Sequence, residues 1–581
     1  MRRRTTAVPA ALVVACLALA GCGVSMPERG PVVEIAATGS QRDSGGVSIN
    51  PRRPGAGDSR QRIVRGFLDA MTATPPIQTS VAREFLTQEA RTDWQPTGMV
   101  IYGNVSTPIH NGKVEAKLVD ADRTDARGAW LGPVSDEDAT LKFPMQIEDG
   151  EWRISEPPPW LVVPKSWFEQ RFRQVSLYFF DPSATMLIPE PVFVPGGQQF
   201  ASALVNGLLQ GPSSELTATE QNFLPRNLRS VAVPVSSDGL ARVELTSDSG
   251  DAPDQAQEQA ELMVSQLAWT LSQDPSIERF VVTVDDRPVQ LAGESEFSVE
   301  HGHEYAPYVA GSSTLLFGLR AGRMVGGSPQ NLATVSGPFG SGGYLLRSVA
   351  VDLRADQVAG VASNGRTLWV GPVKDTGSEP RTLMNAGEDL LRPAWDFSGR
   401  LWEIDRRADG AVVSYLRGDQ MRELDVPGIS GEDVKDFLVS RDGSRIIAVI
   451  RKDGRYVIMA SRVLTAGDGR VIRADAADDV TPPDDDDGVI RDIAWRSPTT
   501  IVVLRPVGRG LFQARSASVD GGSSLDPLLV PINDDVTGLA GTPVPGESTF
   551  AVSNGHLVDL TDPRTPSVLI DDGVTSLGYV G

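Results

Sequence analysis

The stretch SRDGSRIIAVI, Ser440 to Ile450, joins a Ser-x-Asp-Gly turn to a strongly apolar strand. The phrase that leads into it, Phe437 to Ser440, has counterparts that begin at Val349, Pro393, Ile493 and Leu539. The second residues of the five phrases are residues 350, 394, 438, 494 and 540, so they lie 44, 44, 56 and 46 apart. Each phrase precedes an apolar strand, and two further strands usually follow. Four strands in a period of about 45 residues are typical of a β-propeller blade.

The two ends of the repeat region predict how its sheets are completed. The segment TSLGYVG, Thr575 to Gly581, has the form of a first strand with nothing after it, whereas three strand-like segments after Tyr308 lack a first strand. Pairing the two ends would hide sheet edges that are otherwise open to aggregation. We therefore expect an all-β six-bladed propeller over residues 308–581, closed by the C-terminal strand. Its Ser-x-Asp-Gly turn is similar to that of TolB-type propellers.

An α/β module is predicted over residues 175–292. It contains two strands, the helix ALVNGLLQGP with its stop at Gly211-Pro212, and a hairpin around Asp238-Gly239. A longer helix over 254–275 and the strand VTVDDRPV follow. This combination resembles the GerMN domain, and the resemblance implies a role in protein–protein interaction.

A further module is predicted over residues 58–165. It opens with a helix whose N-cap is expected at Asp58, and a second helix is expected over Val81 to Glu89. Strands follow, including one over Ala139 to Glu148 that leads into the turn EDGEWRI. Helices followed by such a meander resemble the NTF2-like α+β domains.

The first 22 residues, MRRRTTAVPAALVVACLALAGC, have the features of a bacterial lipoprotein signal peptide. Arginines form the n-region, and Ala7 to Leu19 form an apolar segment that is short for a membrane span. The box Leu19-Ala20-Gly21-Cys22 predicts a signal peptide over 1–21 and lipidation of Cys22, which would carry S-diacylglycerol and N-palmitoyl groups. Two or more acyl chains anchor a protein stably. The alternative is an ordinary secretory peptide that happens to contain a cysteine.

Residues 22–57 are then the lipidated cysteine and a linker rich in Gly, Pro and Ser, on the extracytoplasmic face of the cell membrane. Because Cys16 is removed with the signal peptide, the mature chain has one cysteine and no disulfide.

The charge balance narrows the range of partners. The chain has 54 Lys and Arg and 75 Asp and Glu, a net charge of −21. Cleavage removes three arginines and no acid, so the mature charge is 51 − 75 = −24. Nucleic-acid binding requires a basic surface, which argues against such a partner. An acidic body is also repelled from an anionic membrane surface.

No catalytic or cofactor motif is evident. The sequence has no G-x-S-x-G elbow and no G-x-x-x-x-G-K-[ST] loop. His301 and His303 have strand spacing and could share a metal ion if a third ligand arrived; a plain interdomain linker is the alternative. Asp484 to Asp487 lack the leading acid and the final Glu of a calcium loop, which favours a solvated acidic loop. We therefore expect no catalytic residue, no metal and no cofactor.

Two groups of residues leave a carbohydrate function open. Trp395, Trp402 and Trp495 could be sugar platforms, although packing within or between blades is favoured. Paired carboxylates for glycoside cleavage could hide among the 75 acidic residues.

The order of the parts is similar to that of the LpqB family of actinobacterial lipoproteins. The resemblance rests on the box ending in Cys22, on ALVNGLLQGP and on TSLGYVG. It implies a non-catalytic accessory of the MtrA–MtrB two-component system that binds the extracytoplasmic domain of the sensor histidine kinase MtrB and affects envelope homeostasis and division. The alternative is an envelope glycan-binding or hydrolytic propeller lipoprotein. A convergent acidic pair with a perturbed pKa in the centre of the propeller would favour that alternative.

Overall fold

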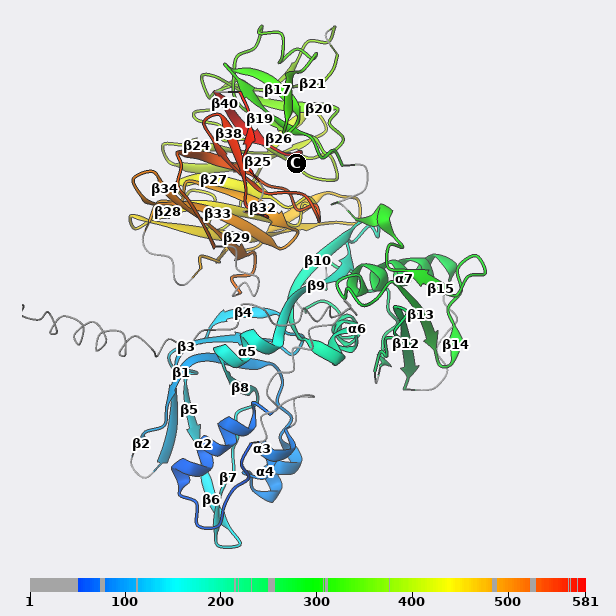
Figure 1. Ribbon diagram of the computed structural model, residues 1–581, viewed down its shortest axis with the longest axis vertical. Helices are drawn as coiled ribbons and strands as arrows, with labels where there is room; N and C mark the ends of the chain where they lie inside the picture. The colour runs from blue at the N-terminus through cyan, green and yellow to red at the C-terminus, as the bar shows by residue number, and fades with distance from the viewer. Residues whose placement is uncertain are drawn as a thin grey trace, which may run out of the picture. The chain divides into compact units, whose positions relative to one another are not determined.

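The computed structural model describes residues 51–73, 79–110, 113–213, 216–217, 219–230, 232–248, 256–306, 308, 312–375, 377–482, 488–522, 529–562, 564, 566–571 and 573–581 (Figure 1). These residues fall within one compact unit, Gly46–Gly581. The predicted signal peptide and Cys22 lie outside the described residues. No helix in the described ranges has the length and apolar character needed to cross a membrane.

The N-terminal domain packs short helices against a mixed sheet. Its elements are α2 (Arg60–Ala70), α3 (Ser80–Arg83), α4 (Gln88–Asp93), β1 (Met99–Ser106), β2 (Ile109–His110), β3 (Lys113–Thr124), β4 (Trp130–Pro133), β5 (Thr140–Phe143), β6 (Met145–Glu148), β7 (Glu151–Ile154), β8 (Leu161–Pro164) and α5 (Lys165–Arg171). The main sheet has the order β2-β3-β1-β8, with β4 and β5 also paired to β3, and β6 and β7 form a separate hairpin. In α2, apolar residues at helical spacing place Ile63, Val64 and Phe67 in the core with 0% exposure.

The helices of this domain differ from the sequence-based expectation in two respects. Ser59, and not Asp58, is the N-cap of α2, because the Ser59 Oγ accepts a hydrogen bond from the N–H three residues later at 3.3 Å. The single helix expected over 81–89 is wrong, since two short helices, α3 and α4, occupy this region. The chain leaves α3, Leu86 bridges to β7, and Thr87 then caps α4 through its Oγ1.

The middle domain contains a hairpin, two main helices and a second sheet. Its elements are β9 (Phe172–Phe180), β10 (Leu187–Pro195), η1 (Gly197–Gln199), α6 (Phe200–Gln210), β11 (Leu228–Arg229), β12 (Leu240–Ser247), α7 (Gln257–Leu271), β13 (Arg279–Val284), β14 (Arg287–Pro288), β15 (Glu296–Ser298) and η2 (His303–Tyr305). β9 pairs only with β10, and the other sheet has the order β11-β12-β13-β14 with β15 on β13. β12 and β13 are parallel, so α7 is the crossover between them. Both predicted helices form, and α6 ends at Gly211 with a φ of 74°.

Two strand predictions upstream of the propeller region also need correction. The strand expected over 139–148 is interrupted at Pro144, which has no N–H to contribute to a ladder. The hairpin expected around Asp238-Gly239 is reduced to a turn with one bridge, Val235 to Ala241. β12 pairs instead with β13 over six residue pairs, because its alternate apolar residues belong to the core shared with α6 and α7.

The C-terminal domain consists of six sheets. Its strands are β16 (Leu316–Arg320), β17 (Arg323–Ser328), β18 (Asn331–Thr334), β19 (Leu346–Val351), β20 (Gln357–Ala362), β21 (Leu368–Pro372), β22 (Arg381–Met384), β23 (Ala394–Trp395), β24 (Leu401–Arg407), β25 (Gly410–Arg417), β26 (Gln420–Leu424), β27 (Val434–Val439), β28 (Arg445–Lys452), β29 (Arg455–Thr465), β30 (Val471–Ala474), β31 (Asp478–Asp479), β32 (Asp492–Ser497), β33 (Thr500–Gly508), β34 (Leu511–Ser518), β35 (Leu529–Ile532), β36 (Val536–Ala540), β37 (Phe550–Ser553), β38 (His556–Asp559), β39 (Val568–Leu569) and β40 (Val574–Gly578).

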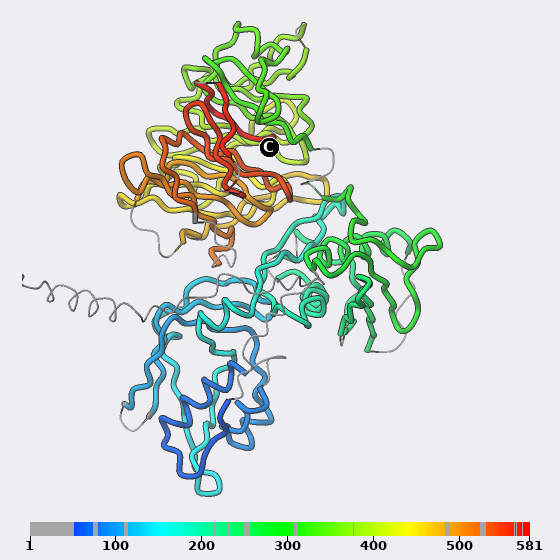
Figure 2. Tube along the Cα trace, viewed as in Figure 1, coloured from blue at the N-terminus to red at the C-terminus, as the bar shows by residue number. Residues whose placement is uncertain are grey.

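The order of strands within these sheets follows the sequence repeat. The five repeated phrases fall at β19, β23, β27, β32 and β36, and each of these strands is the first in its sheet. The sixth sheet has the order β18-β17-β16-β40. The C-terminal strand β40 thus pairs antiparallel with β16, at the other end of the domain in sequence (Figure 2).

Trp395, Trp402 and Trp495, the candidate sugar platforms, pack within and between sheets. Trp395 in β23 donates its Nε1–H to the carbonyl of Ala350 in β19 at 3.2 Å. Trp495 in β32 makes the same bond to Val439 in β27 at 3.1 Å. Trp402 is fully buried. The predicted packing role is therefore confirmed.

The β9–β10 hairpin belongs to more than one core. Val175, Leu177 and their neighbours pack with α6 and α7 in the middle domain. At the far end of the hairpin, Phe172 and Phe193 join the core of the N-terminal domain. There the N–H of Phe193 donates to the carbonyl of Gly128 at 2.8 Å. A Cβ on Gly128, whose φ is 89°, would lie 2.1 Å from the Phe193 carbonyl oxygen.

This close approach generates a test of the junction. Gly128→Ala should lower stability by roughly 2–4 kcal/mol, because the clash adds to the strain of a positive φ. Gly132→Ala is the matched control, since Gly132 has a φ of 80° but open space around its Cβ position. The control should lose only about 1–2 kcal/mol. Urea unfolding followed by tryptophan fluorescence measures both, and equal losses would show that the contact with Phe193 is unimportant.

Candidate functional site

The candidate metal residues of the sequence have separate partners. His301 Nε2 lies 2.6 Å from the carboxylate of Glu261, whereas the ring of His303 packs on Trp269 with centroids 5.7 Å apart. The acidic run Asp484–Asp487 lies outside the described residues. Among the residues that the structure describes, no three His, Cys, Asp or Glu side chains gather as a metal site would require.

A partly buried acidic pair lies on the first strands of two neighbouring sheets of the C-terminal domain. Asp436 is in β27 and Asp492 is in β32, and their carboxyl groups hydrogen-bond to each other. Burial and the adjacent Asp492 raise the pKa of Asp436 well above its usual range. Burial also raises the pKa of Asp492, although Asp436 and the backbone oppose the rise. The two carboxyl groups therefore titrate as a coupled pair, and burial shifts the loss of their protons to higher pH than for an isolated aspartate.

Backbone N–H groups donate hydrogen bonds to the carboxyl oxygens of this pair. Asp436 accepts from its neighbour Phe437 at 2.9 Å and from Ile493 of the next sheet at 3.4 Å. Asp492 accepts from Ile493 at 3.0 Å and from Leu539 of the sheet after that at 2.6 Å. Each carboxyl group therefore links the first strand of its own sheet to the first strand of the next.

The same position in other sheets follows the same rule. Ser576 in β40 accepts from the N–H of Val349 in β19 at 3.3 Å. Ser348 has the equivalent position in β19, but the residue that it would bond in the next sheet is Pro393, which has no N–H. Accordingly, the buried Ser348 Oγ has no hydrogen-bond partner among the described residues. Arg392 reaches back instead and donates to the Val349 carbonyl at 3.1 Å and to a carbonyl of β40 at 3.4 Å.

This arrangement decides between two roles for the acidic pair. A carboxyl group with a raised pKa is the kind of general acid that glycosidases use. A general acid must reach the proton acceptor on a substrate, whereas these oxygens face backbone N–H groups of adjacent strands. The geometry therefore favours a linking role. The sequence carried a signal for the pair, because each member stands one residue before a repeated phrase.

A second charged cluster joins the middle domain to the C-terminal domain. Glu190 of β10 is 5% exposed and receives two guanidinium groups. Arg445 of β28 donates to the Glu190 carboxylate at 3.0 Å and to the carbonyl of Pro189 at 2.8 Å. Arg462 of β29 makes a bidentate pair with the same carboxylate. Although burial opposes ionisation, the two arginines lower the pKa of Glu190 to about 2.

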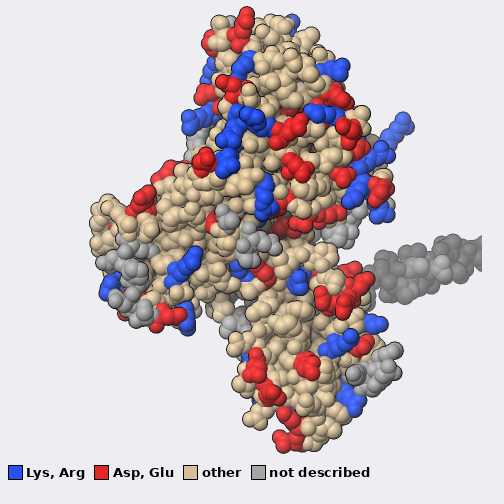
Figure 3. Space-filling model, turned by 180° about the vertical axis from the view of Figure 1, so that it is seen from behind, with Lys and Arg blue, Asp and Glu red and all other residues tan. Residues whose placement is uncertain are grey.

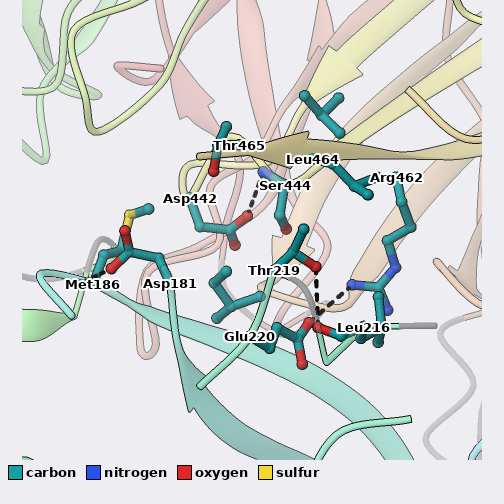
Figure 4. A pocket seen from close by; sticks show the side chains of 12 residues that line it. Asp181, Met186, Leu216, Thr219, Glu220, Asp442, Ser444, Arg462, Leu464 and Thr465 are labelled. Carbon is teal, nitrogen blue, oxygen red and sulfur yellow. Dashed lines mark hydrogen bonds and ion pairs between the residues drawn. The ribbon is translucent and has the colours of Figure 1, made fainter. Parts of the chain in front are cut away.

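Glu220 completes this cluster. It is 4% exposed, and Arg462 lies 3.6 Å from its Oε1 (Figure 4). Burial and the negative charge of Glu190 raise the pKa of Glu220 well above its usual range, which favours its protonated form. The adjoining cavity has a volume of about 20 Å³, which is room for about one water molecule. Because the charged groups of the cluster come from both domains and pair with each other, the cluster serves to hold the two domains together.

A buried arginine ties together the ends of the C-terminal domain. Arg441 is 2% exposed and donates to the carbonyl of Tyr308, which precedes β16, at 3.2 Å. It also donates to Thr542 Oγ1 at 2.9 Å and to the carbonyl of Val580 at 3.1 Å. Burial lowers the pKa of Arg441 to about 10, so the guanidinium is charged at neutral pH. The Tyr308 hydroxyl donates to Asp442 at 3.2 Å, beside the Glu190 cluster.

The Glu190 cluster predicts a large effect of a small change. Glu190→Gln should cost roughly 3–5 kcal/mol, because the buried Arg445 and the partly exposed Arg462 lose the counter-charge of Glu190. Glu423→Gln is the matched control: Glu423 is 71% exposed and lies 3.7 Å from Arg407, and its loss should cost less than about 1 kcal/mol. Calorimetry should show the middle and C-terminal domains unfolding separately only in the Glu190 variant. If both variants unfold like the wild type, Glu190 does not hold the domains.

The acidic pair predicts a dependence of stability on pH. A carboxyl group whose folded-state pKa is raised contributes stability at low pH and loses it as the pH rises through that value. Asp436→Asn mimics the protonated form and does not titrate. The difference in unfolding midpoint between variant and wild type should therefore grow in favour of the variant as the pH rises from about 4, the ordinary pKa of an aspartate, through the raised pKa of the folded state. A difference that is constant with pH would contradict the raised pKa of Asp436.

Comparisons with known proteins give three family matches along the chain. The model described as Lipoprotein LpqB, N-terminal domain, matches residues 53–169, and the Germane model, described as Sporulation and spore germination, matches residues 176–290. The model described as Lipoprotein LpqB beta-propeller domain matches residues 322–559. Among solved structures, the tandem GerMN domains of GerM from Bacillus subtilis are 21% identical with a TM-score of 0.18, covering 22% of this chain and 46% of that one. The putative TolB from Agrobacterium tumefaciens is 13% identical with a TM-score of 0.27, covering 40% of this chain and 87% of that one.

Curated relatives match over most of the chain. Lipoprotein LpqB of Thermobifida fusca is 26% identical and covers 95% of this chain and 97% of its own length. Lipoprotein LpqB of Streptomyces coelicolor is 28% identical and covers 90% of this chain and 89% of its own length. The protein of the same name from Mycolicibacterium smegmatis is 28% identical over 81% of this chain and 90% of its own length. With a GerMN domain, a propeller-type β domain and relatives of this name across actinobacteria, the chain belongs to the LpqB family of lipoproteins.

Proposed function

We propose that this chain is a lipid-anchored lipoprotein on the extracytoplasmic face of the cell membrane that binds and modulates a sensor histidine kinase of the MtrB type. The observation that carries the proposal is the match of 95% of the chain to a curated family lipoprotein. The anchor is the lipidated Cys22, with S-diacylglycerol and N-palmitoyl groups, after removal of a signal peptide over 1–21. Modulation of the kinase would in turn affect envelope homeostasis and division.

The domain bounds and two finer features of the fold are part of this proposal. We assign 22–57 to the anchor and linker, 58–165 to an NTF2-like α+β domain, 175–292 to the GerMN domain and 308–581 to the propeller. We also propose that the six sheets close as a six-bladed ring. The pairing of β40 with β16 and the hydrogen bonds that run from first strand to first strand support closure.

A binding role is consistent with how the domains are joined. The β9–β10 hairpin has residues in two domain cores, and its Glu190 pairs with the propeller domain. Such a body presents its surfaces at fixed distances and angles. A lipid anchor then raises the effective concentration of those surfaces beside a membrane protein, so that weak contacts suffice.

The alternative is an envelope glycan-binding or hydrolytic propeller. The observation in its favour is the raised pKa of the Asp436–Asp492 pair. The backbone hydrogen bonds that occupy this pair make the binding role the better supported of the two.

In-cell crosslinking of the tagged lipoprotein, followed by mass spectrometry, tests the proposal, with Cys22→Ala as the variant. The wild type should fractionate with membranes and capture the extracytoplasmic domain of a sensor kinase. Cys22→Ala should leave the membrane fraction without a change in its thermal unfolding, and its capture of the kinase should fall with the loss of effective concentration.

Two results would contradict the proposal. Equal membrane retention of Cys22→Ala would refute the anchor. Capture of glycan or of peptidoglycan-synthesis proteins alone would refute the kinase and favour the alternative.

A further inference from the structure

The propeller-type domain has two ends, and the middle domain occupies one of them. Arg445 begins the eight-residue strand β28 and Lys452 ends it, so the two residues lie roughly 23 Å apart along the strand. Arg445 contacts Glu190 of the middle domain, and Ser518, at the end of β34, accepts a hydrogen bond from Gln174 of β9 at 2.6 Å. The turns between β28 and β29 and between β33 and β34 therefore lie at the opposite end, away from these contacts.

Charges at this opposite end are mostly paired with each other. Residues just before the first strands pair with residues near the turns between second and third strands: Arg320 with Asp571, Arg406 with Asp389, and His556 with Asp534. Arg347, which lies in the first strand β19, also pairs with Asp389. Figure 3 likewise shows Lys and Arg beside Asp and Glu over the surface in that view. Pairing of this kind is expected in a chain with 75 acids and 54 bases, because each cation has an excess of acids to choose from.

Two adjacent turns carry exposed cations that do not follow this pairing, as do Arg323 and Arg491 among the described residues; exposed Asp453 follows Lys452 at the first of these turns. Arg451 and Lys452, at the β28–β29 turn, and Arg509, at the β33–β34 turn, are exposed. None of the three makes an ion pair with another residue in the described ranges. The two strand pairs pack against each other in one apolar cluster that includes Ile447 and Ile501. We refer to Arg451, Lys452 and Arg509 as the basic turns.

An apolar side chain accompanies the basic turns. Val507 precedes Arg509 by two residues and is 53% exposed. Protein-binding surfaces combine an apolar core with a polar rim, and here Val507 would be the core and the surrounding charges the rim. Charges at such a rim mainly raise the association rate with a partner of opposite sign.

We propose that the basic turns and Val507 form a docking surface for an acidic segment of a partner protein. The proposal rests on the binding role proposed above and adds the surface and the charge of the partner. A protein is favoured over an anionic membrane for a physical reason. Each basic residue near such a membrane contributes only about 1 kcal/mol, whereas the body as a whole carries an excess of 21 negative charges.

A photo-crosslinking amino acid at Val507, in the full-length lipoprotein in cells, tests this surface. Leu131 of β4, which is 52% exposed, is the matched control position. We expect Val507 to crosslink to an acidic peptide of a membrane-associated protein, and Leu131 not to do so. The triple variant Arg451→Glu, Lys452→Glu and Arg509→Glu should reduce the Val507 product by about tenfold, since charge reversal removes electrostatic steering.

A charge-reversal control on another domain separates a local effect from a general one. Lys117→Glu and Lys142→Glu, on exposed positions of the N-terminal domain, should leave the Val507 product unchanged. The triple variant should unfold like the wild type, because surface changes of this kind cost little.

Each other outcome has a defined meaning. A Val507 product that survives the triple variant, or that consists of lipid alone, overturns the docking surface. If the tagged wild type captures a sensor kinase but Val507 does not crosslink to it, the kinase role stands and this surface is wrong. If Val507 crosslinks through the basic turns to an acidic protein that is not a kinase, the surface stands and the kinase role is wrong.

Discussion

The β9–β10 hairpin is the element on which the arrangement of the described domains depends. A two-stranded hairpin is marginally stable by itself in water, so its strands need cover from other parts of the chain. One set of its side chains packs with α6 and α7, and Phe172 and Phe193 enter the N-terminal core. Glu190 then brings an ionised carboxylate against two arginines of the propeller domain. Because burial of an unpaired charge costs several kcal/mol, this cluster tolerates little displacement of one domain relative to the other.

Two acidic residues of this protein have raised pKa values of the kind found in catalytic acids, yet their contacts are structural. Burial and a neighbouring carboxyl group raise the pKa values of Asp436 and Glu220. In each pair the second carboxyl group accepts hydrogen bonds from donors that would otherwise be unsatisfied: backbone N–H groups at Asp492 and guanidinium groups at Glu190. A perturbed pKa therefore marks a place where the fold depends on a proton, and the donors around it distinguish a structural link from an active site.

The surface of the protein combines a strong net negative charge with one local group of basic residues. The strong negative charge keeps the body soluble and away from anionic surfaces. At the end of the propeller domain that faces away from the middle domain, most cations form ion pairs with nearby acids. The basic turns are a local positive group on this otherwise acidic protein. A family whose members are named lipoproteins needs such a local feature if it recognises a partner, since the anchor provides proximity and no specificity.

The sequence by itself determined the parts of this protein that depend on local patterns. The apolar periodicity predicted α2, α6 and α7, the repeat predicted the first strand of each propeller sheet, and TSLGYVG predicted the pairing of β40 with β16. Local rules also failed where contacts from afar compete with them: the bridge from Leu86 to β7 breaks a helix, and β12 prefers a parallel partner to its own hairpin. Only the tertiary structure decided that Asp436 meets Asp492 and that Glu190 meets Arg445, which is 255 residues away. Residue type alone does not identify such pairs in a chain with 75 acids, because proximity in space and loss of solvent select the acids that matter.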